Sequence, residues 1–376
     1  MPPLPIPEFA THLGEQVALL RTLVEIESPS TDKPAVDRIG AVLAERLQGV
    51  GANVQRHPQS DAGDHWLAEW GEAAGGILML AHMDTVFPLG TLERIPWREE
   101  DEHLRGPGVL DMKASLAMAV TAIGVLQQTG RLPRRRLTLL CTSDEETGSR
   151  TSRALIERLA AEHLLVLCLE PALPNGALKT ARKGVGIFRL RAMGRAAHAG
   201  SNPEQGINAV VEMAHQVLRI AALAEPDSGT TLNVGVIQGG TRSNVVPDDC
   251  RARVDVRVDS LEEADRIETA VRGLRPVLPG ASLEIEGGLN RPPMRRTPLI
   301  AQAFSRAQEL GRALGLELQE GKTGGGSDAN YVAPLGIPLL DGLGAVGDGA
   351  HSEREFVLKR SLPERTALLA ALLSEW

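Results

Sequence analysis

The stretch Gly76-Ile77-Leu78-Met79-Leu80-Ala81-His82-Met83-Asp84-Thr85 decides the fold, because an apolar run of strand length stops at a histidine. The run 77–81 is apolar throughout, which predicts a strand buried on both faces. In an extended chain, residues i and i+2 lie on the same side, so Asp84 can reach back toward His82. A carboxylate behind a histidine is a common arrangement at metal sites, although one such pair by itself is a weak signal.

Two further apolar runs of strand length end in acidic residues in the same way. Residues 137–142 lead into Asp144-Glu145-Glu146, and residues 164–169 lead into Glu170. A strongly apolar helix is expected over 113–128, between the first two strands. Strands that are apolar throughout and alternate with helices predict an α/β fold, in which a mixed sheet with a mostly parallel core is flanked by helices.

The pattern changes after about residue 183, where the predicted strands alternate apolar and charged residues. Such alternation is typical of antiparallel strands with one exposed face. The expected order is the β-α-β-β-α-β of a ferredoxin-like α+β domain, with strands over 185–192, 231–237, 250–258 and 282–286 and helices over 207–222 and 261–274. We therefore expect one domain formed by 1–183 and 293–376, and a second, inserted domain formed by 184–292.

Composition and charge disfavour several classes of protein. The 376 residues are 43% hydrophobic and 23% charged, as in ordinary globular proteins of this length with two domains. A net charge of -8 and an aromatic content of 3% disfavour nucleic acid as a partner. The three cysteines lack a CxxC spacing and are expected to be buried, reduced thiols. Without a basic leader or an apolar run near the ~20 residues of a membrane span, we expect a cytoplasmic protein that binds no membrane.

Ligand-type side chains follow the carboxyl ends of the predicted strands, where the sites of open α/β sheets lie. They come from five connections, which contain His82 with Asp84, Asp111, Asp144-Glu145-Glu146, Glu170 and His351. Two histidines with several carboxylates suit zinc, or alternatively manganese or cobalt. Acids at strand ends can also cap helices, but capping explains one acid better than all five connections together. The sequence therefore predicts a metal centre at this edge of the sheet.

At these positions the chain resembles the M20 family of metallopeptidases, and within it the glutamate carboxypeptidase (carboxypeptidase G) group most closely. The resemblance runs through nearly the whole chain, the inserted domain included. The matching motifs are Ala81-His82-Met83-Asp84-Thr85-Val86, Gly106-Pro107-Gly108-Val109-Leu110-Asp111-Met112-Lys113, Asp144-Glu145-Glu146-Thr147-Gly148, Leu169-Glu170-Pro171, Ala197-His198-Ala199-Gly200, Thr323-Gly324-Gly325-Gly326-Ser327-Asp328 and Gly349-Ala350-His351-Ser352. The resemblance implies a zinc-exopeptidase fold, in which the inserted domain is a lid and forms a homodimer.

The resemblance also implies the role of each residue in the metal centre. The implied ligands are His82 and Glu170 for one zinc ion, Glu146 and His351 for the other, and Asp111 as the bridge between them. Asp84 is then the residue that orients His82, and Glu145 is the general base. Two ions that share a water lower its pKa toward about 7, so a neighbouring carboxylate can take its proton. The resemblance further implies a cis peptide bond after Asp111.

The residues expected to bind substrate lie outside the metal motifs. The resemblance implies that His198 reaches across the dimer interface and stabilises the oxyanion of the reaction, a task for a preorganised donor. Asn244 and Arg257 match positions that bind the oxyanion or a substrate carboxylate, and the planar guanidinium of arginine suits a carboxylate. Gly324-Gly325-Gly326 is expected to form a backbone nest for an anion. Without the resemblance, His198 would be a turn residue and Arg257 a solvated residue of an alternating strand.

Several functions compete at this stage. The first hypothesis is a metal-dependent exopeptidase that releases a C-terminal amino acid, glutamate being one candidate, from a small peptide or an N-acyl amino acid. The second is an N-acyl-amino-acid deacylase of the acetylornithine or succinyl-diaminopimelate type, which Asp111-Met112-Lys113 and Arg182-Lys183-Gly184 favour. A third, non-catalytic hypothesis is a protein that retains metal and binds peptides. A nucleotide-binding protein and a serine hydrolase are disfavoured, because the chain lacks a Walker motif, a GxGxxG after its first strand and a GxSxG elbow.

Overall fold

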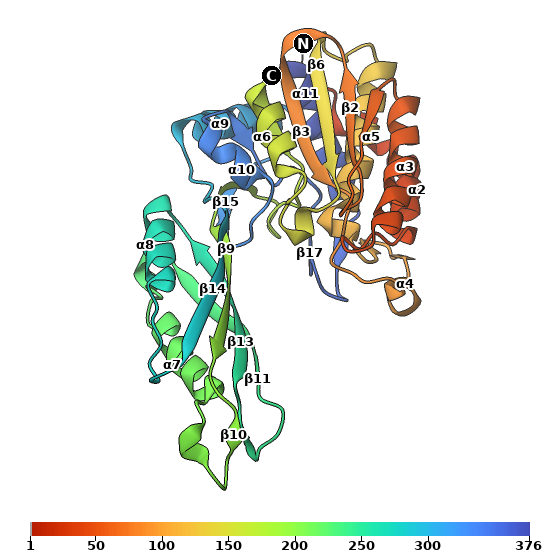
Figure 1. Cartoon of the computed structure of the whole chain (residues 1–376). Helices are drawn as coiled ribbons and strands as arrows, with labels where there is room; N and C mark the ends of the chain where they lie inside the picture. The colour runs from red at the N-terminus through yellow and green to blue at the C-terminus, as the bar shows by residue number, and fades with distance from the viewer. Residues whose placement is uncertain (1) are drawn as a thin grey trace. The chain divides into compact units, whose positions relative to one another are not determined.

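A computed structural model describes residues 2–376, and the side chains of all of them except 73, 74 and 226; it divides into two compact units (Figure 1). The first unit contains the chain up to Ala181 together with Arg296–Lys322 and Ser327–Trp376, and the second contains Arg182–Arg295 and Thr323–Gly326. These boundaries lie within three residues of those expected at 183 and 293. The segment Thr323–Gly326 was expected in the first domain, but it belongs to the second unit.

The first unit is built on a six-stranded sheet in the order β1-β2-β6-β3-β7-β16. Its strands are β1 (Asn53–His57), β2 (His65–Trp70), β3 (Ala73–His82), β6 (Arg135–Thr142), β7 (His163–Cys168) and β16 (Leu339–Leu340). The pairs β6–β3, β3–β7 and β7–β16 are parallel, whereas β1–β2 and β2–β6 are antiparallel. The predicted α/β fold with a mostly parallel core in a mixed sheet is therefore confirmed. The antiparallel edge formed by β1 and β2 was not expected.

Helices cover both faces of this sheet, which explains why β3 is apolar throughout. Ile77, Met79 and Ala81 belong to one core cluster with the helices of one face, whereas Leu78 and Leu80 are buried outside that cluster. The helices of the unit are α1 (Ile6–Ala10), α2 (Leu13–Glu25), α3 (Lys33–Gly49), α4 (Thr91–Arg94), α5 (Ala114–Gln128), α6 (Arg153–Ala161), α9 (Pro298–Ala313), α10 (Ala329–Val332) and α11 (Ser361–Glu375). Burial of each large apolar side chain stabilises the fold by about 1.5–3 kcal/mol, so this core is the main source of stability of the unit.

Helix α5 forms the centre of this core. The helical segment Val109–Gln128, which ends with α5, is long and apolar enough to span a membrane, but 89% of its most apolar window is buried inside the unit. The expectation that no apolar run approaches such a length is therefore wrong, and the segment is a buried core helix. A turn at Thr11, whose hydroxyl donates to the carbonyl of Glu8, separates α1 from α2.

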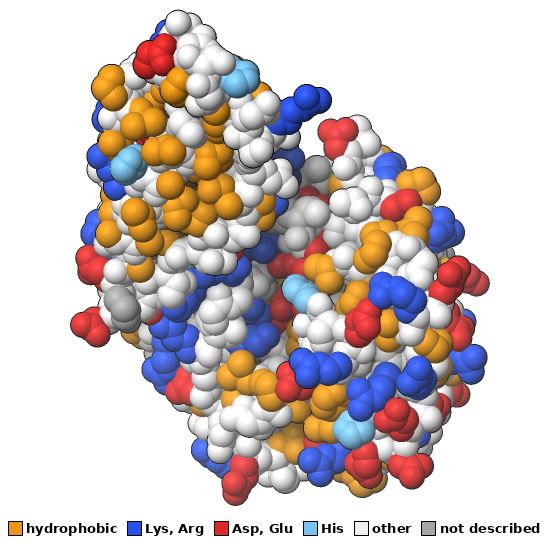
Figure 2. Space-filling model, turned by 90° about the horizontal axis from the view of Figure 1, so that it is seen from below, with side chains coloured by type: hydrophobic (Ala, Val, Ile, Leu, Met, Phe, Trp, Pro, Cys, Tyr) orange, Lys and Arg blue, Asp and Glu red, His pale blue; other side chains and the backbone are white. Residues whose placement is uncertain are grey.

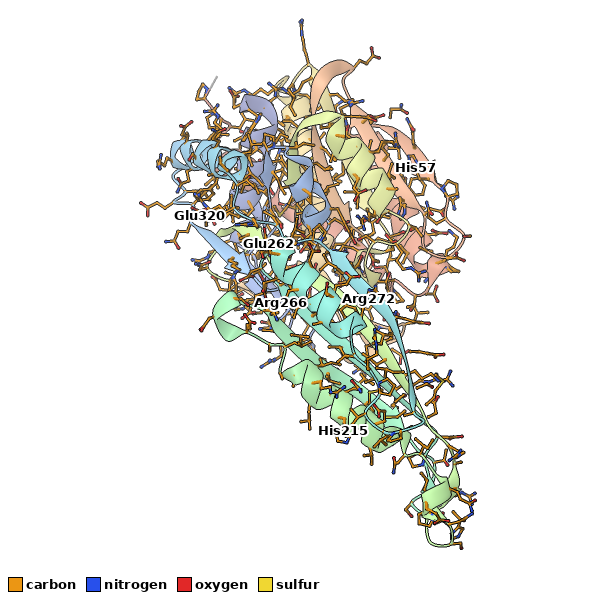
Figure 3. The ribbon with its side chains drawn as sticks, turned by 60° about the vertical axis from the view of Figure 1, so that its left-hand side comes forward. His57, His215, Glu262, Arg266, Arg272 and Glu320 are labelled. Carbon is orange, nitrogen blue, oxygen red and sulfur yellow. The ribbon has the colours of Figure 1, made fainter. Side chains whose placement is uncertain are left out.

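The second unit is a four-stranded antiparallel sheet in the order β11-β13-β9-β14 with two helices. Its elements are β9 (Gly184–Met193), α7 (Ala209–Ala221), β11 (Thr231–Gly239), β13 (Asp249–Val258), α8 (Leu261–Arg272) and β14 (Ser282–Arg291). Figure 3 shows α7, with His215, and α8, with Arg266 and Arg272, on the same face of the sheet. Residues of β9 and β13 alternate between buried and more exposed positions, as their sequence predicted.

Short strands complete both units. In the first unit, β17 (Gly347–Asp348), β18 (Phe356–Leu358), β5 (His103–Arg105) and β4 (Arg98–Glu99) form a four-stranded sheet. The strands β8 (Leu178–Arg182) and β15 (Glu320–Thr323) form a two-stranded sheet. In the second unit, β10 (Ala197–His198) pairs with β12 (Val245–Val246). All three cysteines are free and buried, as predicted.

Candidate metal centre

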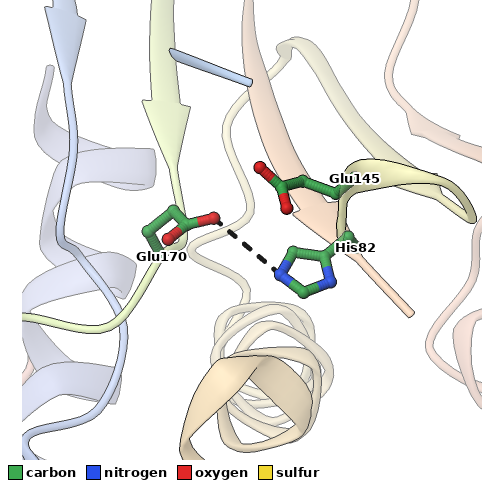
Figure 4. Close-up of side chains that lie close together, drawn as sticks. All are labelled: His82, Glu145 and Glu170. Atoms are coloured by element: carbon green, nitrogen blue, oxygen red, sulfur yellow. Dashed lines mark ion pairs between the residues drawn. The ribbon is translucent and has the colours of Figure 1, made fainter. Parts of the chain in front are cut away.

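Parallel strands bring the predicted ligands to one edge of the sheet of the first unit. β3 ends at His82, the turn after β6 supplies Glu145 and Glu146, and Glu170 follows two residues after the end of β7. These three strands are parallel, so their carboxyl ends lie at the same edge. Figure 4 shows the side chains of His82, Glu145 and Glu170 pointing toward one another. All three side chains are buried.

The ligand atoms form two groups that share Asp111. In the first group, Nε2 of His82 lies 3.1 Å from Oδ1 of Asp111 and 3.8 Å from Oε1 of Glu170. In the second group, Nε2 of His351 lies 3.2 Å from Oδ2 of Asp111 and 3.1 Å from Oε1 of Glu146. Each oxygen of Asp111 therefore faces a different histidine, which is the geometry expected of a bridging carboxylate. The structure brings all five predicted ligands together.

The chemistry of these donors fits two divalent cations. Ligand atoms of His82, Asp111 and Glu146 lie within 4.8 Å of one another, as do those of His82, Glu145 and Glu170. Three carboxylates and two imidazoles are the donors that zinc, manganese and cobalt accept. At this range the carboxylates of Asp111 and Glu146 would repel one another, as would those of Glu145 and Glu170, without positive charge between them. A pair of cations would supply that charge.

The pKa values of the two histidines also show that the surrounding acids favour positive charge at this site. Burial by itself would lower the pKa of His82, but Asp111 and Asp84 raise that pKa well above its ordinary value. Hydrogen bonds that the ring of His351 donates to the carboxylates of Asp111 and Glu146 raise the pKa of His351 to about 11. Burial acts to raise the pKa of Asp111, but His351 and His82 hold it far below its ordinary value. The acids thus favour cations at both histidine positions, and metal ions compete with protons for such sites.

Asp84 has a wider role than the orientation of His82. Nδ1 of His82 lies 2.9 Å from the backbone oxygen of Asp84 and 3.5 Å from its carboxylate. The carboxylate accepts hydrogen bonds from the amides of Glu145 and Glu146, at 3.2 and 3.1 Å, and from the hydroxyl of Ser30 at 2.6 Å. Its oxygens therefore hold the turn that bears two other site residues. The backbone of Asp84, more closely than its side chain, orients His82.

The turn after β6 directs the side chains of the adjacent residues Glu145 and Glu146 to different ligand groups. Glu145 lies with His82 and Glu170, whereas Glu146 lies beside His351. Asp144, the third acid of this turn, accepts hydrogen bonds from the amide and hydroxyl of Thr151 and from the hydroxyl of Ser152, at 2.6–2.9 Å. Asp144 is therefore a structural residue of the loop.

Two buried residues that the sequence analysis did not assign to the site, Lys113 and Glu355, lie at the turn that bears Asp111. The peptide bond between Asp111 and Met112 is cis, as the resemblance implied. Lys113 donates from Nζ to the carbonyl of Ile26 at 2.9 Å, and burial lowers its pKa to about 7. Glu355 accepts hydrogen bonds from three amides of the turn. A charged residue inside an otherwise apolar stretch was the signal available for Lys113, whereas no local pattern pointed to Glu355.

In the second unit, His198 and Asn244 lie together at one end of the sheet. His198 of β10 pairs with Val245 of β12, and the amide of Ala199 donates to the carbonyl of Asn244 at 3.0 Å. Nδ1 of His198 accepts hydrogen bonds from the amides of Gly200 and Ser201, at 3.1 and 3.0 Å. In the neutral ring the proton is therefore on Nε2, and the exposed side chain can offer it as a hydrogen-bond donor.

Arg257 and the glycine loop lie together at the other end of this sheet. Arg257 pairs with Asp255 through two bonds of 2.8 and 2.9 Å, and its Nη1 lies 3.3 Å from the carbonyl of Gly324. Arg182 donates to the carbonyls of Gly325 and Gly326. The amide of Gly325 donates to the hydroxyl of Thr323, and no glycine of the loop has a positive φ.

The expected anion nest is therefore not formed, because the loop directs carbonyl oxygens toward arginines. Two further basic residues, Arg182 and Arg291, lie buried beside this loop, and the sequence analysis assigned neither of them to the site. Their signal was slight, since each is a single arginine at the end of a strand, Arg182 of β8 and Arg291 of β14.

The fold and the paired ligand groups define a metal-dependent hydrolase of the zinc-exopeptidase type. A model of peptidase family M20/M25/M40 matches residues 78–375, so the chain belongs to this family of metallopeptidases and amidohydrolases. Carboxypeptidase G2 of Pseudomonas sp. strain RS-16 is 30% identical over 98% of this chain and 91% of that protein. A succinyl-diaminopimelate desuccinylase of Rhodospirillum centenum is 28% identical over 96% of this chain and 97% of that protein. The solved aminopeptidase PepT of Bacillus cereus has the same fold, with a TM-score of 0.76 and 24% identity over 96% of this chain and 98% of that chain.

Proposed function

We propose that this protein is a zinc-dependent exopeptidase that hydrolyses a peptide or N-acyl amide bond and releases a C-terminal amino acid. The observation that carries the proposal is Asp111, whose two oxygens each face one histidine–carboxylate pair while Glu145 lies beside one of these pairs. These side chains would hold two adjacent metal ions and leave Glu145 to act as a separate base. Manganese and cobalt are the alternatives to zinc, because the donor set suits all three.

The residues of the chain divide the reaction between them. When bound, the two ions lower the pKa of a water and polarise the scissile carbonyl. Glu145, buried next to His82 and Glu170, takes the proton of the attacking water and passes it to the leaving amine. Nε2–H of His198 donates to the oxyanion of the tetrahedral intermediate, and Asn244, at the same end of the second unit, assists it.

Arg257 supports a substrate with a free carboxylate. Its Nη1 points to the glycine loop, while Asp255 binds its Nε and Nη2. Arg182 and Arg291 add positive charge beside the same loop. A charge-assisted hydrogen bond to a carboxylate contributes about 1.5–3 kcal/mol. The similarity to a carboxypeptidase favours release of a C-terminal amino acid, for which glutamate is the first candidate.

A matched pair of substrates tests this assignment. We expect an N-acyl glutamate to be hydrolysed with a kcat/KM about 10–100-fold above that of its C-terminal amide, as the energy of one charge-assisted bond requires. Replacing Arg257 with alanine should remove this preference, chiefly through KM. Arg253→Ala, four residues earlier on the same face of β13, is the control and should retain it. Equal rates for the acid and the amide with the unaltered protein would contradict the carboxypeptidase assignment.

A deacylase remains the second candidate, favoured by the similarity to the desuccinylase. Such an enzyme would hydrolyse N-succinyl-diaminopimelate or N-acetylornithine in preference to peptides that end in glutamate. One panel of these substrates, assayed with zinc, manganese and cobalt added to metal-free protein, separates the two candidates.

The second unit supports a homodimer. His198 lies five residues beyond the end of β9, whereas Arg257 pairs with Val185 at its start. The ten residues of β9 span about 33 Å, so these residues of one chain do not reach the same small substrate. A second copy that supplies His198 resolves this separation. The exposed edge strand β11 and helix α7 offer the interface.

Exposed apolar residues give this interface a direct test. Val236 and Ile237 of β11 are 48% and 51% exposed, and Leu218 of α7 is 71% exposed. Figure 2 shows hydrophobic side chains gathered on one face of the second unit. We expect the double substitution Ile237→Glu and Leu218→Glu to convert a dimer into a monomer in sedimentation experiments and to abolish activity. Leu261→Glu, on α8, is the control. A fully active monomeric wild type would contradict the proposal.

A further inference from the structure

We infer that Glu355 is a positioning residue that fixes the bridging ligand Asp111 through the backbone of its turn. The inference rests on the metal centre of the proposed function. Oε2 of Glu355 accepts a hydrogen bond of 3.0 Å from the amide of Gly108. Oε1 accepts bonds of 2.7 Å from the amide of Leu110 and 2.9 Å from the amide of Asp111 itself. Glu355 is only 3% exposed, so water does not substitute for these contacts.

The place of Glu355 in the chain makes this clamp a link between two ligands. Glu355 lies four residues after His351 and immediately before β18. In β18, Phe356 pairs with Arg105 of β5, and the turn with Gly108 begins just after β5. The paired strands therefore hold the backbone on both sides of the clamp. One loop supplies a metal ligand, His351, and also the carboxylate that holds the turn of the bridging ligand.

The chemistry of the turn explains why a carboxylate is needed. The amides of Gly108, Leu110 and Asp111 all point to one carboxylate inside the protein, and buried amides that lack acceptors destabilise a fold. A carboxylate offers two oxygens that accept without donating. Asp111 must also be placed within about 0.5 Å to serve two ions at once. A clamp on its own amide restricts the backbone from which its side chain projects.

Asp84 provides a parallel within the same centre. Its carboxylate, on the connection that bears His82, binds the amides of Glu145 and Glu146. The connections with His82 and Glu146 are thereby joined, just as Glu355 joins those with His351 and Asp111. The two buried carboxylates thus connect four of the five ligand-bearing segments in pairs. Neither carboxylate is assigned to the metal ions.

The alternative is that Glu355 contributes only to stability, and a matched substitution separates the two roles. Glu212 of the second unit is also buried, and its carboxylate accepts bonds from the amides of Val277 and Leu278, at 2.9 and 2.7 Å. It lies outside the metal centre. Glu355→Gln and Glu212→Gln therefore both weaken a buried carboxylate–amide clamp, but only the first clamp touches a metal ligand.

The test is a titration of metal-free protein with Zn²⁺ in competition with a chromogenic chelator, together with the visible spectrum of the Co²⁺-loaded protein. We expect Glu355→Gln to weaken metal binding by about 10–100-fold and to alter the Co²⁺ spectrum. Its kcat should fall while KM changes little. Glu212→Gln should lower the Tm but leave the metal affinity within about twofold of the wild type, because Glu212 touches no metal ligand. Loss of a residue that orients a metal ligand typically lowers metal affinity by about 10–100-fold.

The outcomes distinguish this inference from the proposed function. If Glu355→Gln binds Zn²⁺ as tightly as the wild type, with an unchanged Co²⁺ spectrum, Glu355 is a stability residue only and the inference is overturned. If the wild type itself binds no metal, the proposed function fails. If Glu355→Gln does not fold, Glu355→Asp keeps the charge but shortens the reach, and its metal affinity, expected to lie between the wild-type and glutamine values, decides in the same way.

Discussion

Replacing Glu145 with glutamine lowers kcat by about 10²–10⁴-fold, the range of a general acid–base contribution, and leaves both metal ions bound. Glutamine has nearly the same shape but cannot take a proton from water. The structure places Glu145 beside His82 and Glu170, where a base would face the attacking water, and Asp84 holds its amide. The measurement is kcat with the best substrate of the panel, together with metal content after dialysis.

The adjacent residue provides the control for this experiment. Glu146→Gln changes the same functional group one position along, but Glu146 lies 3.1 Å from Nε2 of His351 in the second ligand group. We expect it to lose metal as well as activity. A Glu145→Gln protein that loses metal to the same extent would show that Glu145 is a ligand, and one with full activity would refute its role as base.

Replacing Asp111 with asparagine should lower the metal content below two ions per chain and reduce kcat by about 10²–10⁴-fold. Asp111 faces both histidines, with one oxygen toward each. Asparagine keeps one acceptor and turns a donor toward the other ion, so charge stabilisation of several kcal/mol is lost. Each 1.4 kcal/mol lost corresponds to a tenfold lower rate. Metal analysis after dialysis against a weak chelator provides the measurement.

Asp144→Asn is the matched control for this substitution. Asp144 is buried near the same edge of the sheet, but its oxygens bind Thr151 and Ser152. We therefore expect a lower Tm with an unchanged number of ions per chain. If Asp144→Asn removed as much metal as Asp111→Asn, the loss would reflect general loosening of the loops, and the bridging role of Asp111 would not be supported.

Much of the site could be predicted from local sequence. The apolar strand that ends at His82 and the acidic turn after β6 follow from strand periodicity, and parallel pairing then places their ends together. The same periodicity, changed from continuous to alternating, separated the inserted domain from the rest. Its boundaries were less certain, because Thr323–Gly326 joins the second unit through contacts with Arg182 and Arg257 that are distant in sequence.

The sequence by itself determined the class of the fold, since that depends on short periodic patterns, and the family resemblance of its motifs predicted the five ligands. Only the tertiary structure decided which other acids are structural. Asp84, Asp144 and Glu355 each bind backbone amides, and whether a carboxylate meets an amide or a metal depends on segments far away in the chain. The tertiary structure also decided that His198 and Arg257 lie at opposite ends of one sheet, because the direction of β9 and β13 sets that separation.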